Sequence, residues 1–381
     1  MSDTQLQDQD LTEDHGRQDD RDGNGFVVAL LSIGAAIAVP LLLFLSLKFV
    51  LDTFSGLPDL VTAVIAILVG VIGIFFVYTA VDKGISKLLP PRLGDRVRPY
   101  AWSGPAIVLL TIFLIYPAIN VIQLSFTDAF GDAYVGFDNY AYVFTDGAML
   151  RSLRNTLLWI IVVPVFAVAI GLGIAVLSDK LKRLESVAKS LIFLPMAISF
   201  VGAAIVWRFV YSFRIEGSGE QIGILNGIWT SLGNAPVAWL DQVPWNNFFL
   251  MVIMIWLNTG FAMVILSAAI KGVPEDILEA ARIDGANEIQ VFWRVIVPNI
   301  MSSIVVVLTT MVIGVLKVFD IVWVMTGGQD GTEVIAERMI RNMFTFRHFG
   351  RGAAIAVFMF VAVIPVMYIN VRRFREEESM R

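Results

Sequence analysis

The sequence predicts an all-α polytopic membrane protein with eight transmembrane helices. The 381 residues are 57% hydrophobic and only 16% charged, whereas soluble domains carry about 25% charged residues. Eight charge-free apolar runs of 18 or more residues follow one another, and a helix needs about 20 apolar residues to cross the hydrocarbon core. The runs are 26–47, 60–81, 100–127, 155–178, 190–207, 246–270, 298–316 and 352–371.

The composition also divides the chain into regions. Residues 1–25 hold eight acidic residues and two arginines, so they bury too little apolar surface to fold, and a disordered acidic cytoplasmic tail is expected. Residues 26–99 are expected to form an N-terminal pair of transmembrane helices and a basic cytoplasmic loop, 82–99, that contains Pro90 and Pro91. Residues 100–371 then form a six-helix core, and 372–381 a cytoplasmic tail.

Lysine and arginine indicate the orientation, because they are enriched in cytoplasmic loops. They gather in 82–99, 179–189, 271–297 and 372–381, whereas 48–59, 128–154 and 208–245 hold few. The segment 317–351, with five basic residues, departs from this alternation. The distribution favours both termini in the cytoplasm.

Several chemistries have no support in the sequence. The chain has no cysteine and two histidines, which argues against disulfides and a His/Cys metal site. It has no GxxxxGK[ST] phosphate loop and no HExxH pattern. The basic clusters lie at membrane edges, where they set topology rather than bind nucleic acid. We therefore expect no cofactor and no catalytic residue in this chain, so it is not an enzyme.

A helical loop is expected between the sixth and seventh runs, where residues 279–298 read EAARIDGANEIQVFWRVIVP. Pro274 suits a first helical position, and Gly285 suits a helix end. Asn287 can cap a second helix, with Gln290 completing a capping-box pair. The result is two short helices at an angle, a shape that fits a groove on another protein.

This loop resembles the EAA coupling loop in membrane subunits of binding-protein-dependent ABC importers. The positions carried over are Glu279, Ala280, Ala281, Asp284, Gly285 and Pro298. Val295 and Val297 stand where the family usually has Ile and Leu. The resemblance implies that Glu279 pairs with a basic residue of an ATPase, that the alanines allow close seating, and that Gly285 holds the bend. The alternative is an interfacial amphipathic helix without a partner, which predicts neither the spacing nor the glycine.

The resemblance extends over about residues 100–374, with the ABC transmembrane type-1 domain at about 152–370. Stretches such as KSLIFLPMAISFVGA and LKVFDIVWVMTGG resemble permeases of carbohydrate importers, most closely the alpha-glucoside type related to the larger maltose permease. This implies the type I importer permease fold in the bacterial cell (inner) membrane and transport by alternating access. It also implies three kinds of partner: a second permease in a heterodimer, two ATP-binding subunits that hold ATP and Mg²⁺, and an extracytoplasmic sugar-binding protein. One departure is that the outer loop after the third run holds no large folded domain.

The sugar path is expected on the two spans that flank the coupling loop, because polar residues inside spans are costly and usually functional. Asn258 and Phe261 lie three residues apart in the sixth span, and Lys317 and Asp320 three apart near the end of the seventh. Gly314, one turn before Lys317, is expected to allow close approach. The alternative is structural: Asn258 as a helix–helix hydrogen bond, and Lys317 with Asp320 as an ion pair, or Lys317 as a snorkelling lysine.

Two other classes of function remain as alternatives. An ion-gradient-driven secondary sugar transporter is expected to carry carboxylates in mid-membrane, and many such transporters contain inverted repeats. The eight runs contain no acidic residue, which argues against it. A membrane enzyme would need a catalytic constellation, and none is evident.

Overall fold

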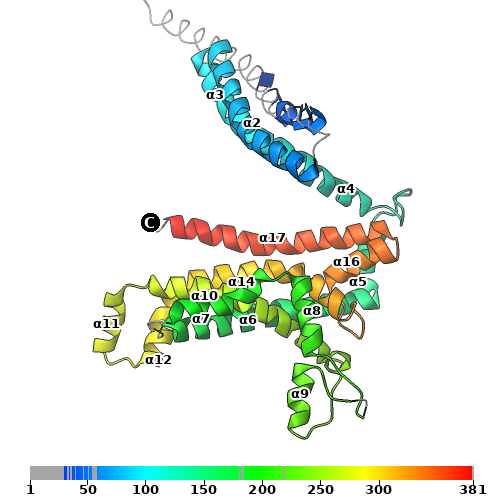
Figure 1. The fold of residues 1–381 in the computed structure, drawn as a ribbon, viewed down its shortest axis with the longest axis vertical. Helices are drawn as coiled ribbons and strands as arrows, with labels where there is room; N and C mark the ends of the chain where they lie inside the picture. The colour runs from blue at the N-terminus through cyan, green and yellow to red at the C-terminus, as the bar shows by residue number, and fades with distance from the viewer. Residues whose placement is uncertain are drawn as a thin grey trace, which may run out of the picture. The chain divides into compact units, whose positions relative to one another are not determined.

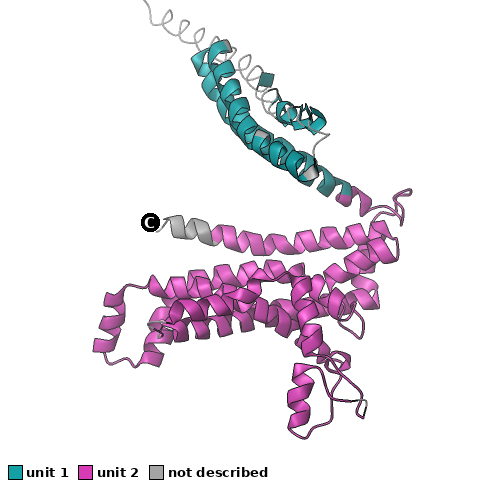
Figure 2. Ribbon diagram, viewed as in Figure 1, with its two compact units in different colours: residues 1–120 teal, residues 121–381 magenta. Residues whose placement is uncertain are grey.

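The structure is a computed structural model that describes residues 30–379 apart from 32–33, 35–36, 39, 46, 50, 54–57, 180, 182–183 and 218. The acidic tail and ten of the 22 residues of the first predicted span therefore lie outside the described residues. The chain divides into two compact units, residues 1–120 and 121–381, which Figure 2 distinguishes by colour. The regular elements among the described residues are all helices, as predicted (Figure 1).

Five helices in the described part are long and apolar enough to cross a membrane. They are α2 (Asp59–Leu88), α3 (Pro91–Leu110) continued by η1 (Thr111–Ile115) and α4 (Tyr116–Leu124), α6 (Gly147–Asp179), α10 (Asn246–Lys271) and α17 (Phe349–Ser379). They correspond to the second, third, fourth, sixth and eighth predicted runs.

The fifth and seventh predicted runs are bent rather than straight. In the fifth, α7 (Glu185–Phe193) and η2 (Leu194–Ala197) meet α8 (Phe200–Val210) at 102°. In the seventh, the segment Glu288–Asn299, which holds α12 (Glu288–Val291), η4 (Phe292–Ile296) and α13 (Val297–Asn299), meets α14 (Met301–Leu316) at 68°. If each bent pair is one span, the described residues contain seven spans.

In the first unit, the basic segment 82–99 is not the loop that the sequence suggested. Helix α2 continues to Leu88 and α3 begins at Pro91, so only two residues connect them. Proline is well suited to a first helical position because its missing N–H has no partner there. Arg98 of α3 joins the two helices through Asp82 of α2, at 3.1 Å. It also pairs with Asp95 of its own helix, at 2.8 Å. The prolines that indicated a loop instead start a helix.

In the second unit, α6 and α10 approach closely because small residues lie between them. A Cβ atom added at Gly171 of α6 would lie 2.6 Å from the Cβ of Ala262 and 2.9 Å from the backbone nitrogen of Met263 in α10. Small residues bring helix backbones together in membranes, where packing rather than the hydrophobic effect drives association. Beyond this contact, Trp159 and Leu250 are fully buried in one apolar cluster.

A polar network holds the loop 326–334 against α6 and the first turn of α10. Asn155 Nδ2 donates to the carbonyl oxygens of Gly331 and Glu333 at 2.7 and 2.9 Å. Asn246 and Asn247 donate to the carbonyls of Asp330 and Gly331 at 2.8 and 3.0 Å. These buried amides anchor the loop at the end of α10 opposite to Lys271.

The close crossing of α6 and α10 predicts that Gly171→Leu forces the two helices apart. Overpacking of this kind costs about 1–3 kcal/mol or more, so the purified variant should unfold at a lower temperature than the parent in detergent. Gly173→Leu is the matched control on the same helix, because a Cβ there meets no atom within 4 Å. Equal melting temperatures for the two variants would contradict the close crossing.

Candidate functional site

Helix α10 leads directly into the segment expected to couple to a partner. After α10 ends at Lys271, helix α11 (Glu275–Ile283) begins, with Pro274 as its N-cap residue. Pro274 thus precedes the helix by one position and does not occupy the first helical position that we expected. In Figure 1, α11 and α12 project from one end of the second unit.

Gly285 ends α11 in the way that the sequence predicted. Its φ angle is +85°, a left-handed conformation that glycine adopts without steric cost. The N–H of Gly285 donates to the Arg282 carbonyl at 3.0 Å, and the N–H of Ala286 donates to the Ala281 carbonyl at 3.1 Å. This pair of bonds is a Schellman motif, which satisfies carbonyls that the helix end leaves open.

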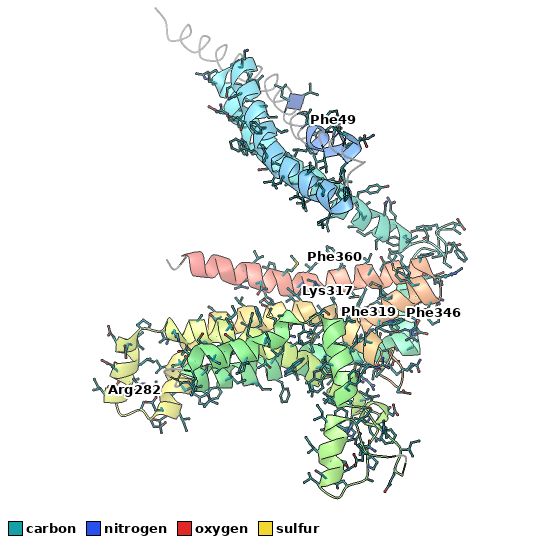
Figure 3. All side chains as sticks on the ribbon, viewed as in Figure 1. Phe49, Arg282, Lys317, Phe319, Phe346 and Phe360 are labelled. Carbon is teal, nitrogen blue, oxygen red and sulfur yellow. The ribbon has the colours of Figure 1, made fainter. Side chains whose placement is uncertain are left out.

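The second short helix begins with the predicted capping box. Asn287 Oδ1 accepts from the Gln290 N–H at 2.9 Å, and Gln290 Oε1 accepts from the Asn287 N–H at 2.9 Å. Arg282 Nε then lies 2.9 Å from Glu288 Oε1 and joins α11 to α12; Figure 3 labels Arg282 there. This hydrogen bond raises the pKa of Arg282 further, so the arginine stays charged at any physiological pH.

The segment presents an apolar surface that the fold leaves uncovered. Ile283, Ile289 and Trp293 are 85%, 71% and 61% exposed. Glu279 and Ala280 are exposed as well, and Ala281 is half-buried. Exposed apolar residues gathered on one short segment are typical of an interaction site. The geometry therefore suits docking to another protein, while the roles assigned to Glu279, Ala280, Ala281, Asp284, Gly285 and Pro298 stay predictions.

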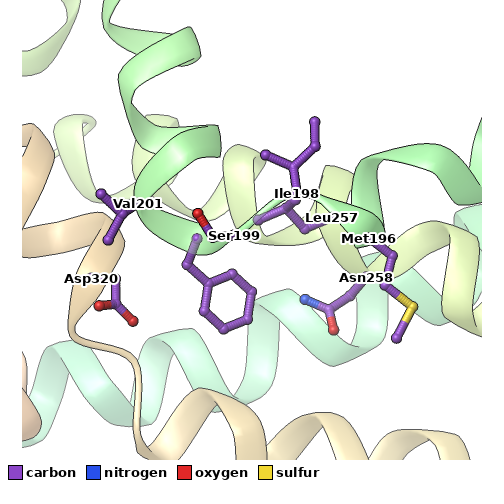
Figure 4. Close-up of a pocket in the computed structure, with 8 residues that line it drawn as sticks. Met196, Ile198, Ser199, Val201, Leu257, Asn258 and Asp320 are labelled. Carbon is purple, nitrogen blue, oxygen red and sulfur yellow. The ribbon is translucent and has the colours of Figure 1, made fainter. Parts of the chain in front are cut away.

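A cavity of about 430 Å³ lies at the bend between η2 and α8. Its lining comes from three elements: the bend itself, the middle of α10, and the first residue of α15 (Asp320–Met325). The lining residues are Met196, Ile198, Ser199, Phe200, Val201, Leu257, Asn258 and Asp320 (Figure 4). The volume lies within the range of about 300–1,000 Å³ that small-molecule sites occupy.

Three polar side chains reach this mostly apolar cavity. Ser199 caps α8 by accepting from the Gly202 N–H at 3.1 Å. Asn258 Nδ2 donates to the Met254 carbonyl of its own helix at 2.8 Å. Within the described part of the chain, Asn258 Oδ1 and the Asp320 carboxylate have no hydrogen-bond partner. Figure 4 shows Asn258 and Asp320 on opposite sides of the cavity, so a bound molecule can meet both.

The other residues predicted for the sugar path lie elsewhere. Phe261 packs against the apolar cluster that includes Ala262 and Leu266. A Cβ atom at Gly314 meets nothing within 4 Å among the described residues, so the expected close approach is not found.

Lys317 and Asp320 do not share one helix face, although their spacing of three residues predicted that they would. Helix α14 ends at Leu316 and α15 begins at Asp320, so the rule that residues three apart are neighbours does not apply. Lys317 instead lines a second cavity of about 500 Å³ with Phe319 and Phe360, and Figure 3 labels all three.

The sequence analysis missed Ser199 and the bend around it. Pro195 and Ser199 inside the fifth apolar run were the available signals, because proline limits the helix before it and serine is a favoured N-cap. Proline is tolerated within membrane helices, however, so these residues were read as part of one continuous span.

Comparison with known proteins agrees with this geometry. Residues 167–374, more than half of the chain, match the family "Binding-protein-dependent transport system inner membrane component". The chain belongs to this family. It is 57% identical to the osmoprotective compounds uptake permease protein GgtC of Synechocystis sp., over 73% of this chain and 99% of that protein. It is 49% identical to the alpha-glucoside transport system permease protein AglF of Rhizobium meliloti, over 76% of this chain and 85% of that protein.

A solved structure supports the fold of this binding-protein-dependent permease. A chain of a bacterial ABC transporter involved in the import of the acidic polysaccharide alginate aligns with a TM-score of 0.62 and 24% identity, covering 72% of this chain and 94% of that chain. The likeness shows the importer permease fold. Because GgtC is covered almost completely by about three quarters of this chain, about one quarter of this chain has no counterpart in that protein.

The geometry of Gly285 predicts which substitutions the α11–α12 bend tolerates. Gly285→Val places a β-branched residue at φ +85°, which costs about 1–2 kcal/mol and favours a different bend. Substrate uptake by cells should therefore fall strongly while the amount of protein in the membrane stays normal. Gly285→Asn is the control, because asparagine tolerates the left-handed region, and it should retain most uptake. Normal uptake with the valine variant would contradict a role for the bend.

Proposed function

We propose that this chain is a permease subunit of an ATP-driven, binding-protein-dependent importer whose substrates are sugars, specifically alpha-glucosides. The observation that carries the proposal is the pairing of an exposed, tightly capped coupling segment with a cavity on the same helix, α10. Membership of the importer family and 49% identity to an alpha-glucoside permease support it. The alternative, a secondary transporter driven by an ion gradient, has no comparable support.

The proposed partners are those that the likeness to importer permeases implies. ATP and Mg²⁺ belong to two separate ATP-binding subunits that dock on α11 and α12. A second, different permease completes the translocation path, and an extracytoplasmic binding protein delivers the sugar. The complex lies in the bacterial cell (inner) membrane, with both termini of this chain in the cytoplasm.

Transport then proceeds by alternating access. ATP draws the two ATP-binding subunits together, α11 and α12 move with them, and the spans turn to expose the cavity to one side and then the other. The cavity suits a glucoside, because Ser199, Asn258 and Asp320 offer hydrogen-bonding groups and Phe200 offers an aromatic face. Binding at a break in a span is common in transporters, since the broken helix ends supply polar groups in mid-membrane.

The identity of 57% to an osmoprotective compounds permease favours a second candidate within the same class. A glucoside that accumulates as a compatible solute would satisfy both relatives. The two candidates differ in when transport is needed, namely for growth on a sugar or for survival at high salt.

Uptake of labelled maltose, sucrose and trehalose tests the substrate class in a strain that has no other route for them. Asn258→Leu and Asp320→Leu should lower uptake about tenfold or more, because each removes a hydrogen-bonding group from a site built for hydroxyls. Thr310→Val is the control, since Thr310 is a polar residue of α14 that bonds its own helix at 2.8 Å and does not line this cavity.

Three outcomes separate the proposals. No uptake of any glucoside by the parent strain would contradict the substrate class. Uptake by both variants at the parent rate would contradict the cavity. Growth protection at high salt by the imported sugar would favour the osmoprotective candidate over a nutritional one.

The orientation predicts a difference between two cysteines introduced into this cysteine-free chain. A cysteine at Ser231 of α9 (Ile224–Ser231) should react with an impermeant maleimide added outside intact spheroplasts, and one at Asp276 of α11 should react only after lysis. Both positions are exposed. The reverse labelling pattern would invert the proposed topology.

A further inference from the structure

A group of five polar side chains gathers near the coupling segment, where α6 and α10 end and α7 begins. Asp179 is the last residue of α6, Glu185 the first of α7, and Lys271 the last of α10. Lys189 and Ser267 lie one turn inside α7 and α10. We call these five residues the ionic clasp. They were not recognised from the sequence, where the lysines served only to indicate orientation.

Lys189 lies at the centre of the ionic clasp and joins all three helices. Its Nζ lies 2.8 Å from Asp179 Oδ1 and 2.6 Å from Glu185 Oε1, and it also donates to Ser267 Oγ. These contacts use all three donors of the ammonium group. Its side chain is only 18% exposed. Such a lysine is held in place, whereas a lysine that marks topology alone needs no partner.

The ionic clasp extends to the start of the coupling segment. Lys271 pairs with Glu185 and lies 4.0 Å from Asp179, and Ser267 donates to Asp179 at 3.0 Å. Lys271 stands four residues before Glu275, where α11 begins. A displacement of α11 therefore acts first on a residue that is tied to the first turn of α7.

The far end of α7 is also fixed to α10. A Cβ atom at Gly260 would lie 2.5 Å from the Ile192 carbonyl oxygen and 2.8 Å from the Phe193 Cα, so the two backbones touch there. With both ends of α7 fastened, α7 and α10 move together. The next residues along the chain form η2, and Met196 of η2 lines the cavity that holds Asn258.

We propose that the ionic clasp transmits displacement of α11 and α12 through α7 to the η2 turn at the cavity, with Lys189 as the positioning residue. This inference rests on the proposed importer function, because it assumes that an ATP-binding subunit moves the coupling segment. Without the ionic clasp, α10 still moves with α11, but α7 is held only by its contact at Gly260. It then turns about that single contact, and η2 no longer follows α10.

The test measures movement of η2 in the assembled complex in lipid nanodiscs. Met196→Cys introduces the only cysteine of this chain. The variant is treated with a small maleimide in the presence and absence of ATP and vanadate, and mass spectrometry follows the rate of labelling. In the parent, ATP should change this rate. Lys189→Met should reduce the ATP-dependent change about tenfold, a typical coupling strength between sites, while ATP hydrolysis stays near the parent rate.

Three further variants separate transmission from simple stability. Lys189→Arg keeps the charge and should retain most of the effect of ATP. Lys87→Met, an exposed lysine of α2 without an ion pair in the described structure, should behave as the parent. Asp179→Asn combined with Lys189→Met also removes the acidic charge that loses its nearest lysine in the single variant, and the double variant should stay uncoupled like the single one.

The outcomes are decisive for the ionic clasp and independent of the sugar. An unchanged effect of ATP in Lys189→Met, no effect of ATP in the parent, or recovery of coupling in the double variant would each overturn the proposal. The readout needs no substrate, so a failure of the parent to carry any glucoside would refute the substrate class and leave this result intact.

Discussion

Close contact between helix backbones at two glycines of neighbouring spans underlies the arrangement of the second unit. Gly171 lets α6 lie against Ala262 of α10, and Gly260 lets α10 receive the backbone of α7 at Ile192. Van der Waals packing, interhelical hydrogen bonds and the entropy of the released lipids hold helices together in a bilayer, so atomic fit at these crossings matters more than hydrophobicity. Because α10 takes part in both contacts, its position determines those of its neighbours.

This central helix also joins three parts with different chemistry. Its first turn holds the loop 326–334 through Asn246 and Asn247, its middle places Asn258 at the cavity, and its last residue takes part in the ionic clasp. A helix of 26 residues spans about 39 Å at 1.5 Å per residue. A single rigid element therefore connects the docking segment to the cavity without an intervening flexible loop.

The features that the sequence predicted correctly are those decided by local chemistry. The glycine at the end of α11 and the pair Asn287 and Gln290 act within six residues, so their spacing alone predicts the bend. The apolar runs were recognised for the same reason, because each span satisfies its backbone groups within itself.

The features that the sequence did not predict depend on residues far apart in the chain. Asp179 and Lys271 meet only because α6 and α10 cross, and no spacing pattern records that crossing. The break after Leu316 likewise separated Lys317 from Asp320, although their spacing fits one helix face. The bend at Ser199 is an intermediate case, since its cap is local but proline in a membrane span does not by itself indicate a bend.

The ionic clasp also changes how the basic residues of this chain are interpreted. Lys189 and Lys271 were counted as signals of a cytoplasmic loop, yet both are neutralised by acids on the same helix ends. In the α2–α3 hairpin, by contrast, Lys83, Lys87, Arg92 and Arg96 are exposed and have no ion pair among the described residues. Unpaired charge is what interacts with the anionic cytoplasmic leaflet, at about 1 kcal/mol for each basic residue near the surface. Lys189 and Lys271 thus hold helix ends together, which suits the mechanical role proposed for the ionic clasp.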